Sequence, residues 1–263
     1  MARVHLFEFG DKKWVPKILR DYQTDFLEFG ANQFDTYRPV MDILEEGVER
    51  SSNQEVLDMG SGGGGGWPKI INNFKEQGKK IKVKFTDFDP NLSAFYKMKE
   101  RFPSVIDYEE QPVDAQNIPS RLKGFRTMFL SFHHMKPKMA QQILQNAVDS
   151  EEPIGIFELQ DRSPLSLLFM FIFAPINIIL TAPFIKPFSL GRIFFSILFP
   201  ILPIITWWDG VVSNLRTYHE HELWALVNKL EGGTQYEWNI GRKKSGPGFV
   251  LYLFGYKKRD LSA

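Results

Sequence analysis

The residues best suited to chemistry form a glycine loop. Residues 55–66 read Glu-Val-Leu-Asp-Met-Gly-Ser-Gly-Gly-Gly-Gly-Gly, a short apolar strand that leads into an acid and then into glycines. Glycine takes positive φ readily and lets the main chain approach a ligand with no side chain between them. The helix expected to begin near Trp67-Pro68 would offer unpaired N–H groups to that ligand. This combination of strand, turn and helix predicts a site for a nucleotide-like cofactor.

The loop alone does not name the cofactor. The spacing acid-x-Gly-x-Gly-x-Gly starts at Asp58, but the same letters also contain the Gly-x-Gly-x-x-Gly pattern of dinucleotide sites, which starts at Gly60. A second apolar run, 81–86, ends at Asp87, whose carboxylate can accept hydrogen bonds from two ribose hydroxyls. A nicotinamide dinucleotide and other adenosine cofactors both use such an acid, so both stay open on these residues.

Two later segments decide between these cofactors through a family resemblance. Residues 113–119, Val-Asp-Ala-Gln-Asn-Ile-Pro, look like the Asp-Ala-x-x-Leu-Pro segment of class I S-adenosylmethionine-dependent methyltransferases. Residues 125–135, which contain His-His, are similar to the fourth strand and following turn of that family. The resemblance covers roughly residues 50–160 and 215–257. It implies a methyltransferase of the small-molecule type with S-adenosyl-L-methionine as its cofactor.

The resemblance also implies which residues bind the cofactor. The acid after the second strand, Asp87, is expected on the ribose, and Asp114 is expected on the adenine amino group. Phe88 is expected against the adenine face. The full set of predicted cofactor residues is Asp58, Gly60, Ser61, Gly62, Asp87, Phe88, Asp114, Ala115 and Ser131.

The order of elements predicts an α/β fold with a doubly wound, mostly parallel sheet. Strands are expected at 54–58, 82–87, 105–109, 126–131 and 154–159, and helices at 67–77, 91–102 and 137–149. Two further strand-like runs, 235–243 and 248–256, are joined by a Ser-Gly-Pro-Gly turn. They would complete the seven strands of a Rossmann-like methyltransferase fold, with an antiparallel last strand. One departure from the family is Ser-Glu-Glu-Pro at 150–153, where many relatives carry Pro-Gly-Gly.

Two additions flank this core, which is predicted at 51–162 and 209–263. Residues 1–50 form an N-terminal helical cap, in which an amphipathic helix is predicted from residues at three- and four-residue steps, namely Trp14, Ile18, Tyr22, Phe26 and Phe29. Such extensions commonly fold over cofactor and substrate in the resembling family; the alternative is that these side chains pack against the sheet.

The second addition is a hydrophobic insert at 163–208. Residues 165–208 contain two charged residues, Lys186 and Arg192, and eight of the 24 phenylalanines. Five prolines interrupt the segment, so short helices in a hairpin are expected, with both basic residues at the level of lipid headgroups and Trp207-Trp208 at the membrane boundary. The insert either dips into one leaflet, forms a soluble lid or dimer surface, or spans the bilayer.

Composition restricts the partners and the compartment. A formal net charge of +1 gives no electrostatic reason to expect nucleic acid, whose binding requires clustered excess cations. The absence of cysteine excludes disulfides, thiolate catalysis and zinc–thiolate sites. The first residues do not resemble a secretory signal, so the body of the protein is expected in the cytoplasm, peripherally on the inner face of a membrane. The oligomeric state is left open.

Four residues are candidates for a catalytic role. An oxygen, nitrogen or acidic carbon acceptor can require a base, and histidine suits that role. His133 and His134 follow the fourth strand, where the family places substrate-facing residues. They either act on the substrate or serve as a helix cap and a main-chain partner. Asp209 and Arg216, beside the insert, either orient a polar headgroup or form its solvated edges.

The sequence predicts no metal site. Methyl transfer is an in-line displacement that requires no metal ion, since positioning and a dry pocket supply much of the catalysis. A capping box, Thr217-x-x-Glu220, predicts a helix over 218–230. His219 and His221 on its first turn are two residues apart and so lie on different faces, which argues against a shared ion.

Together, the residues and the resemblance predict transfer of a methyl group from S-adenosyl-L-methionine to a small lipophilic acceptor, presented by a bilayer or held under the insert. The alternative is a non-catalytic protein of the same fold that keeps the cofactor pocket as a sensor or scaffold. An aminopropyl transferase is disfavoured, because the chain lacks an acidic cluster suited to a polyamine.

Overall fold

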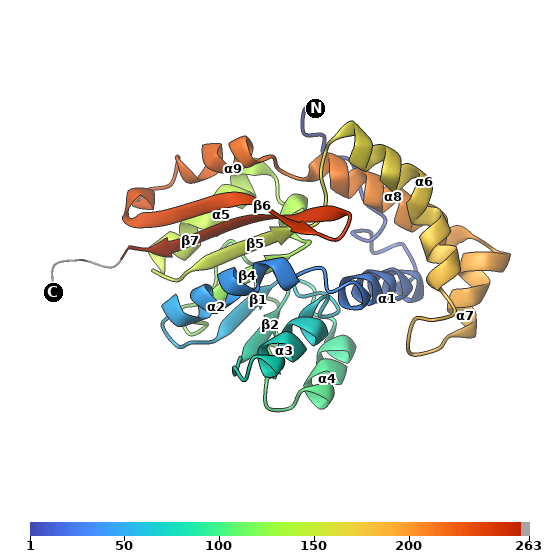
Figure 1. The fold of residues 1–263 in the computed structure, drawn as a ribbon, viewed down its shortest axis with the longest axis horizontal. Helices are drawn as coiled ribbons and strands as arrows, with labels where there is room; N and C mark the ends of the chain where they lie inside the picture. Colours follow the sequence, from blue (N-terminus) through green and yellow to red (C-terminus); the bar gives the residue numbers. More distant parts are fainter. Residues whose placement is uncertain (259–263) are drawn as a thin grey trace.

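A seven-stranded sheet forms the centre of the computed structural model, which describes residues 1–258 (Figure 1). The strand order is β3-β2-β1-β4-β5-β7-β6; the first five strands of the chain run parallel, and β7 is antiparallel to both of its neighbours. The strands are β1 (Val56–Met59), β2 (Val83–Thr86), β3 (Ile106–Tyr108), β4 (Phe125–Phe129), β5 (Ile154–Glu158), β6 (Tyr236–Ser245) and β7 (Gly248–Lys257). The predicted fold is confirmed. The last part of the predicted core, 259–263, lies outside the described residues.

Helices cover both faces of the sheet, which is why its central parallel strands are apolar runs buried throughout. Figure 1 shows α5 and α9 on one face and α2, α3 and α4 on the other. The helices are α1 (Lys17–Gln33), α2 (Met41–Arg50), α3 (Trp67–Glu76), α4 (Leu92–Arg101), α5 (Pro137–Asp149), α6 (Pro164–Thr181), α7 (Leu190–Ile193), α8 (Ile201–Arg216) and α9 (Glu220–Val227). Single turns of 3-10 helix occur at Arg38–Val40, Phe132–His134 and Gly233–Gln235.

The turn before β5 keeps a glycine-like backbone without a glycine. Glu151 has a φ of 56°, in the left-handed region that non-glycine residues rarely adopt. It stands in the segment where relatives of the resembling family carry Pro-Gly-Gly. The departure in sequence therefore leaves the chain path into β5 intact.

The N-terminal cap consists of an irregular strap, residues 1–16, followed by α1, a 3-10 turn and α2. The predicted amphipathic face of α1 is partly wrong, because Trp14 and Ile18 are 70% and 50% exposed. Tyr22 and Phe26 of the predicted face do pack against residues of α6 and α8, together with Val15 and Leu19. The insert is thus the packing partner of α1, and contact with it determines which side chains of α1 are buried.

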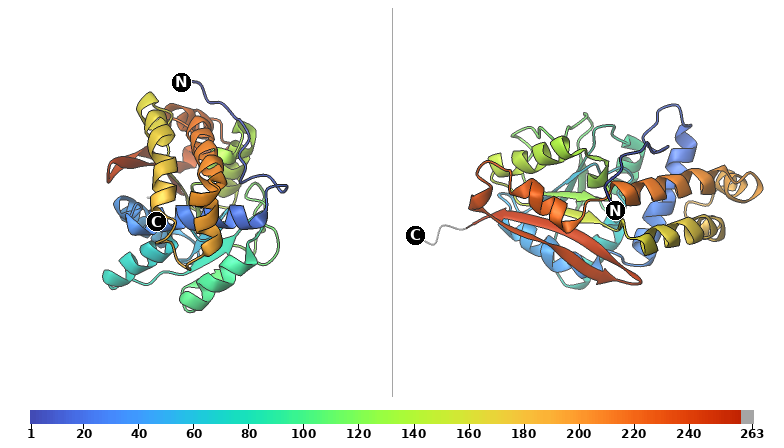
Figure 2. Two further views of the ribbon diagram at one scale, coloured as in Figure 1. Left: turned by 90° about the vertical axis from the view of Figure 1, so that its right-hand side faces the viewer. Right: turned by 90° about the horizontal axis from the view of Figure 1, so that it is seen from above.

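The insert folds as a helical pair that projects beyond the end of the sheet. Figure 2 shows α6 and α8 side by side and antiparallel, joined through α7 and a π-helical turn at Phe194–Leu198. The expected hairpin is found, and its tip contains the expected short helical pieces, but α6 is long because it continues through Pro175. The predicted boundary after residue 208 falls inside α8, which ends only where the Thr217 hydroxyl donates a hydrogen bond to Ser213 O at 2.8 Å.

Arg192 is not at a headgroup level, and that expectation is wrong. Its guanidinium is buried, donates to Ile185 O at 2.8 Å, and forms an ion pair with Asp25 of α1. Lys186, by contrast, is exposed. A buried guanidinium requires a paired charge, so Arg192 ties the tip of the insert to α1.

Most apolar side chains of the insert face outward. Helix α6 is 18 residues long, has a mean hydropathy of 2.1, and is apolar enough to cross a membrane. Residues 190–198 and α8 together also pass this criterion, but are bent by 78°. The exposed apolar residues of the insert include Leu165, Leu168, Phe169, Phe171, Ile172, Phe173, Ile176, Leu180, Phe184, Phe188, Leu190, Phe194, Ile197, Leu198, Phe199 and Ile204.

The start of α9 differs from the predicted capping box. The N-cap is His219, whose N–H donates to Glu222 Oε2 at 2.7 Å. Thr217 belongs to the end of α8, as described above. The capping-box motif predicts the right helix but places its start too early, because Thr217 caps the preceding helix.

Candidate active site

The glycine loop connects the buried end of β1 to the start of α3. Gly60 and Gly62 have φ values of 66° and 55°, which strain any residue with a Cβ. A Cβ on Gly62 would meet no heavy atom within 4 Å, so the main chain there faces open space. Asn32 of α1 fixes the far side of the loop, where its side chain donates to Gly65 O at 2.9 Å and accepts from Lys69 N at 2.8 Å. The loop thus presents bare main chain at the carboxyl edge of the sheet.

Asp58 and Ser61, both predicted as cofactor residues, support the loop from beneath. The Asp58 carboxylate is buried, which raises its pKa to about 6, and accepts a hydrogen bond from Thr127 Oγ1 of β4 at 2.7 Å. Ser61 Oγ donates to Asp58 O at 3.0 Å and accepts from Thr86 N at 3.2 Å. These bonds join three strands to the loop and set its shape.

Asp87, Phe88, Asp114 and Ala115 lie together beside the open side of the loop. Gly62 N–H donates to Asp87 Oδ2 at 2.9 Å, and partial burial raises the pKa of that carboxyl above its usual range. The residue before Asp114 donates its N–H to Asp87 O at 2.8 Å, which places the two predicted adenosine-binding acids on adjacent turns. Phe88 is 73% exposed, so its ring is free to contact a ligand.

Leu130 and Ser131 follow β4 on the other side of the loop. Leu130 has a φ of 49°, a strained conformation of the kind that occurs at functional turns. Ser131 Oγ is buried and has no hydrogen-bond partner among residues 1–258, and a Cβ on Gly60 would lie 3.3 Å from it. A polar group of a ligand would satisfy this hydroxyl. The site therefore fits an adenosine cofactor with a polar tail.

His133 forms a buried dyad with Glu158 at the end of β5. His133 Nδ1 lies 2.8 Å from Glu158 Oε2, and the His133 N–H donates to Glu158 Oε1 at 3.0 Å. A carboxylate at Nδ1 places the proton on that nitrogen and leaves Nε2 as an acceptor. Nε2 is buried and has no hydrogen-bond partner in the described part of the chain. This is the arrangement of a base held in one orientation by a carboxylate.

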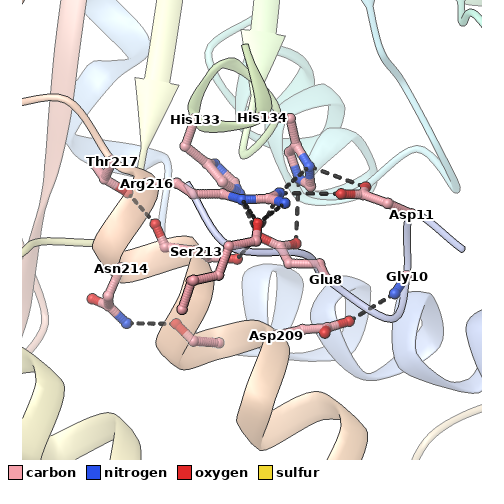
Figure 3. Close-up of polar contacts among 12 residues, drawn as sticks. Glu8, Gly10, Asp11, His133, His134, Asp209, Ser213, Asn214, Arg216 and Thr217 are labelled. Atoms are coloured by element: carbon pink, nitrogen blue, oxygen red, sulfur yellow. Dashed lines mark hydrogen bonds and ion pairs between the residues drawn. The ribbon is translucent and has the colours of Figure 1, made fainter. Parts of the chain in front are cut away.

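His134 and Arg216 bind the N-terminal strap (Figure 3). Arg216 Nη1 donates to Glu8 Oε1 at 2.9 Å and to Asp11 Oδ2 at 3.1 Å, and its Nε donates to Leu6 O at 2.9 Å. His134 Nδ1 lies 3.1 Å from Asp11 Oδ1. Both side chains are therefore engaged by the strap, whereas His133 pairs through Nδ1 with Glu158 of the sheet.

Asp209 holds the next part of the strap. Its buried carboxylate accepts hydrogen bonds from Phe9 N at 2.6 Å, Gly10 N at 2.8 Å and Gln23 Nε2 at 2.8 Å. The expectation that Asp209 and Arg216 form solvated edges is wrong, because both are buried and hydrogen-bonded. The two residues lie on α8 and bind successive strap residues, so their contacts favour a role in holding the strap over the site.

Sequence reasoning missed two strap residues, Glu8 and Asp11, and gave Glu158 no definite role. Glu8 is buried, and burial raises its pKa to about 7 despite the favourable charges of His134 and Arg216. The only local signal is an acid between Phe7 and Phe9 in an apolar run. Burial of such an acid requires a distant partner that a single sequence does not identify.

Glu8 predicts a pH-dependent stability. Its pKa rises from 4.5 to about 7 on folding, so between these values the folded chain keeps a proton that the unfolded chain releases. The free energy of unfolding should therefore decrease as pH rises through this window, by on the order of 3 kcal/mol. Glu8→Gln should lack this decrease. Urea denaturation of both proteins at pH 5 and pH 8 measures it, and a pH-independent difference between them would show that Glu8 stays ionised.

Comparison with solved structures identifies the fold. No protein-family model and no curated protein sequence matches the chain. The plantazolicin methyltransferase BpumL, in complex with SAH, has a TM-score of 0.53 at 12% identity over 95% of this chain and 92% of that one. A SAM-dependent methyltransferase from Aquifex aeolicus has a TM-score of 0.50 at 15% identity, covering 90% and 97%. The O-methyltransferase NcsB1 from neocarzinostatin biosynthesis, in complex with SAH and 1,4-dihydroxy-2-naphthoic acid, has a TM-score of 0.54 at 10% identity, covering 96% and 62%. The chain has the fold of class I S-adenosylmethionine-dependent methyltransferases, as predicted.

Proposed function

We propose that this protein transfers the methyl group of S-adenosyl-L-methionine to a small lipophilic acceptor. The observation that carries the proposal is the glycine loop, which binds Asp87 through the open main chain at Gly62 and has the unpaired hydroxyl of Ser131 beside Gly60. The fold shared with solved methyltransferases supports it.

The chain's own residues would hold the cofactor at both ends. Asp87 has acceptor positions left for ribose hydroxyls, because a carboxylate offers about four, of which Gly62 N–H occupies one on Oδ2 and Asp89 N–H one on Oδ1. Asp114 and Phe88 would contact the adenine, and Ser131 the amino-acid end. When bound, the cofactor supplies an electrophilic methyl group on a cationic sulfur. The loop and Ser131 would orient that group toward the acceptor, and this positioning is expected to supply the largest part of the rate acceleration.

His133 is the proposed base for the acceptor. Its Nε2 would take the proton from an acceptor hydroxyl or amine, while Glu158 at Nδ1 stabilises the imidazolium that forms. The dyad is buried beneath the strap, which excludes water from a reaction that neutralises charge. The acceptor must therefore enter by displacing part of the strap.

The insert supports a lipophilic acceptor taken from a membrane surface. Its outer face exposes a continuous set of apolar residues on α6 and the tip, far beyond the scattered apolar residues of an ordinary protein surface. Its inner face is committed to protein, because α8 contributes Asp209, Ser213 and Arg216 to the strap contacts. A helical pair with one apolar and one protein-bound face suits a peripheral position in one leaflet better than a span.

One observation favours the alternative, a non-catalytic cofactor-binding scaffold or sensor. The cavity beside Phe132, Glu158 and Tyr218 measures about 10 Å³, which holds at most one water. With the strap closed there is no room for an acceptor at this point. Incubation with labelled cofactor and a cell lipid extract separates the two functions, because only the enzyme forms a labelled organic-soluble product.

Cofactor binding gives the direct test. Asp87→Ala should weaken binding of S-adenosyl-L-methionine and of its demethylated product by at least about tenfold, the scale of a hydrogen bond to a charged group. Isothermal calorimetry measures both affinities. The matched control is Asp89→Ala, which removes an exposed acid two residues away and should leave them unchanged. Tight binding of NAD without binding of the sulfonium cofactor would contradict the proposal.

A further inference from the structure

Three side chains of metal-ligand type converge beneath the strap, although the sequence separates them widely. Glu8 comes from the strap, and His133 and His134 come from the turn after β4 (Figure 3). One ligand atom from each lies within 4.8 Å of the other two. Glu8 Oε1 is 4.0 Å from His133 Nε2, and Glu8 Oε2 is 3.7 Å from His134 Nε2.

Each imidazole is oriented by a carboxylate at its other nitrogen. Glu158 lies 2.8 Å from His133 Nδ1, and Asp11 lies 3.1 Å from His134 Nδ1. Arg216 Nη1 is also 3.1 Å from His134 Nδ1 and donates to Asp11 as well. Histidine ligands of metal ions characteristically have such a carboxylate behind them, which fixes the tautomer and raises the basicity of the ligating nitrogen.

The atoms that face one another lack other partners. His133 is only 2% exposed, and its Nε2 is buried without a hydrogen bond among residues 1–258. Both hydrogen bonds that the structure shows to the Glu8 carboxylate, from Ser213 and Arg216, fall on Oε1. A buried acceptor without a donor costs free energy, so a cation or a proton bound to His133 Nε2 and Glu8 Oε2 would stabilise the site.

The charges around the cluster leave room for a divalent ion. Glu8, Asp11 and Glu158 contribute three carboxylates, and the Arg216 guanidinium contacts both Glu8 and Asp11. With neutral imidazoles, these four residues carry a surplus of two negative charges, most of it buried. A dication would neutralise that surplus.

We infer that Glu8, His133 and His134 bind one divalent transition-metal ion of the zinc class, through Glu8 Oε2 and the two Nε2 atoms. Two imidazoles, one carboxylate and an open fourth position form a ligand set that zinc accepts. Ligand atoms around tetrahedral zinc lie about 3.4 Å apart, so the side chains must move closer than the 4.0 Å and 3.7 Å that separate the Glu8 oxygens from His133 Nε2 and His134 Nε2.

The bound ion would fasten the strap to the core and occupy the lone pair of His133 that the proposed base uses. The inference does not rest on the proposed function, but an ion bound there would block His133 from acting as the base.

Cobalt(II) gives a direct test, because its visible absorption distinguishes protein-bound, low-coordinate ion from the hydrated ion. Chelator-treated protein should bind one Co²⁺ per chain, displaced by Zn²⁺, and Zn²⁺ should raise the thermal midpoint of unfolding. Glu8→Gln and His134→Ala should each weaken binding by at least about tenfold, since even partners behind a ligand cost that much.

The matched control is the double variant His219→Ala, His221→Ala. This second histidine pair lies on the surface near α9, with ring centroids 5.6 Å apart, and outside the cluster. Its removal should leave the stoichiometry and affinity unchanged. Hydrated cobalt spectra in the wild type, or loss of binding only in this control, would overturn the inference. Calorimetry with S-adenosyl-L-methionine on the metal-free protein keeps that failure separate from failure of the proposed function.

Discussion

His133→Asn should reduce methyl transfer by at least about a hundredfold, the scale of lost acid–base assistance. Asparagine keeps an N–H donor near the position of Nδ1, so Glu158 retains a partner, but it lacks the acceptor at Nε2. Binding of the cofactor should change little, because the side chain of His133 hydrogen-bonds to Glu158 and not to Asp87 or to the glycine loop. The assay is purified protein, labelled cofactor and a cell lipid extract, with label counted in organic-soluble product.

His134→Asn is the matched control. His134 is adjacent in sequence but pairs with Asp11 of the strap, so its loss should reduce the rate much less than loss of His133. Glu158→Gln should fall between the two, because it keeps a hydrogen bond to His133 but removes the charge that stabilises the imidazolium. A larger loss in the His134 variant than in the His133 variant would reassign the base. Absence of product from any extract, with normal cofactor binding, would favour the sensor.

The parts predicted correctly from the sequence are those in which short-range chemistry decides the structure. The glycine loop was readable because positive φ at Gly60 and Gly62 requires that residue type. The start of α5 at Pro137 was readable because proline suits a first helical turn. The parallel order of strands followed from alternating elements, whereas the cofactor roles of Asp87 and Asp114, taken from the family resemblance, stay predictions.

The parts missed depend on contacts between distant segments. Glu8 and Arg216 lie 2.9 Å apart and 208 residues apart in sequence, so a single sequence gave no reason to associate them. The buried face of α1 was misassigned at Ile18, because its partner is the insert. Arg192 was placed at a membrane surface on composition, whereas an ion pair with Asp25 buries it.

Helix α8 links the candidate site to the exposed insert. Its C-terminal half holds the strap through Asp209, Ser213 and Arg216, and its N-terminal half carries the exposed Ile204. A force applied to the insert by a bilayer would therefore reach the strap through one continuous helix. Under the proposed function the strap must move before an acceptor reaches His133, so contact of the apolar surface with a membrane would help to open the site.

The protein should accordingly sediment with lipid vesicles through the tip of its insert. Phe184, Phe188 and Phe199 are 70%, 64% and 57% exposed, so their replacement by serine removes apolar surface without opening the core. Phe195, by contrast, packs against the buried cluster between α1 and α8 and should be left unchanged. At about 1 kcal/mol for each partly buried phenylalanine, the triple variant should bind vesicles roughly a hundredfold more weakly.

The matched control is the double variant Trp14→Ser, Phe34→Ser, which removes two similarly exposed aromatic residues at the ends of the α1 region, outside the insert. It should still sediment, and both variants should bind S-adenosyl-L-methionine as the wild type does, because the glycine loop lies outside the insert. Sedimentation at zwitterionic and anionic vesicles separates apolar from electrostatic attachment, and a net charge of +1 favours the apolar kind. If the wild type stays in the supernatant as a compact monomer or dimer, the exposed phenylalanines must be covered by protein, and the insert is then a soluble lid whose acceptor arrives from solution.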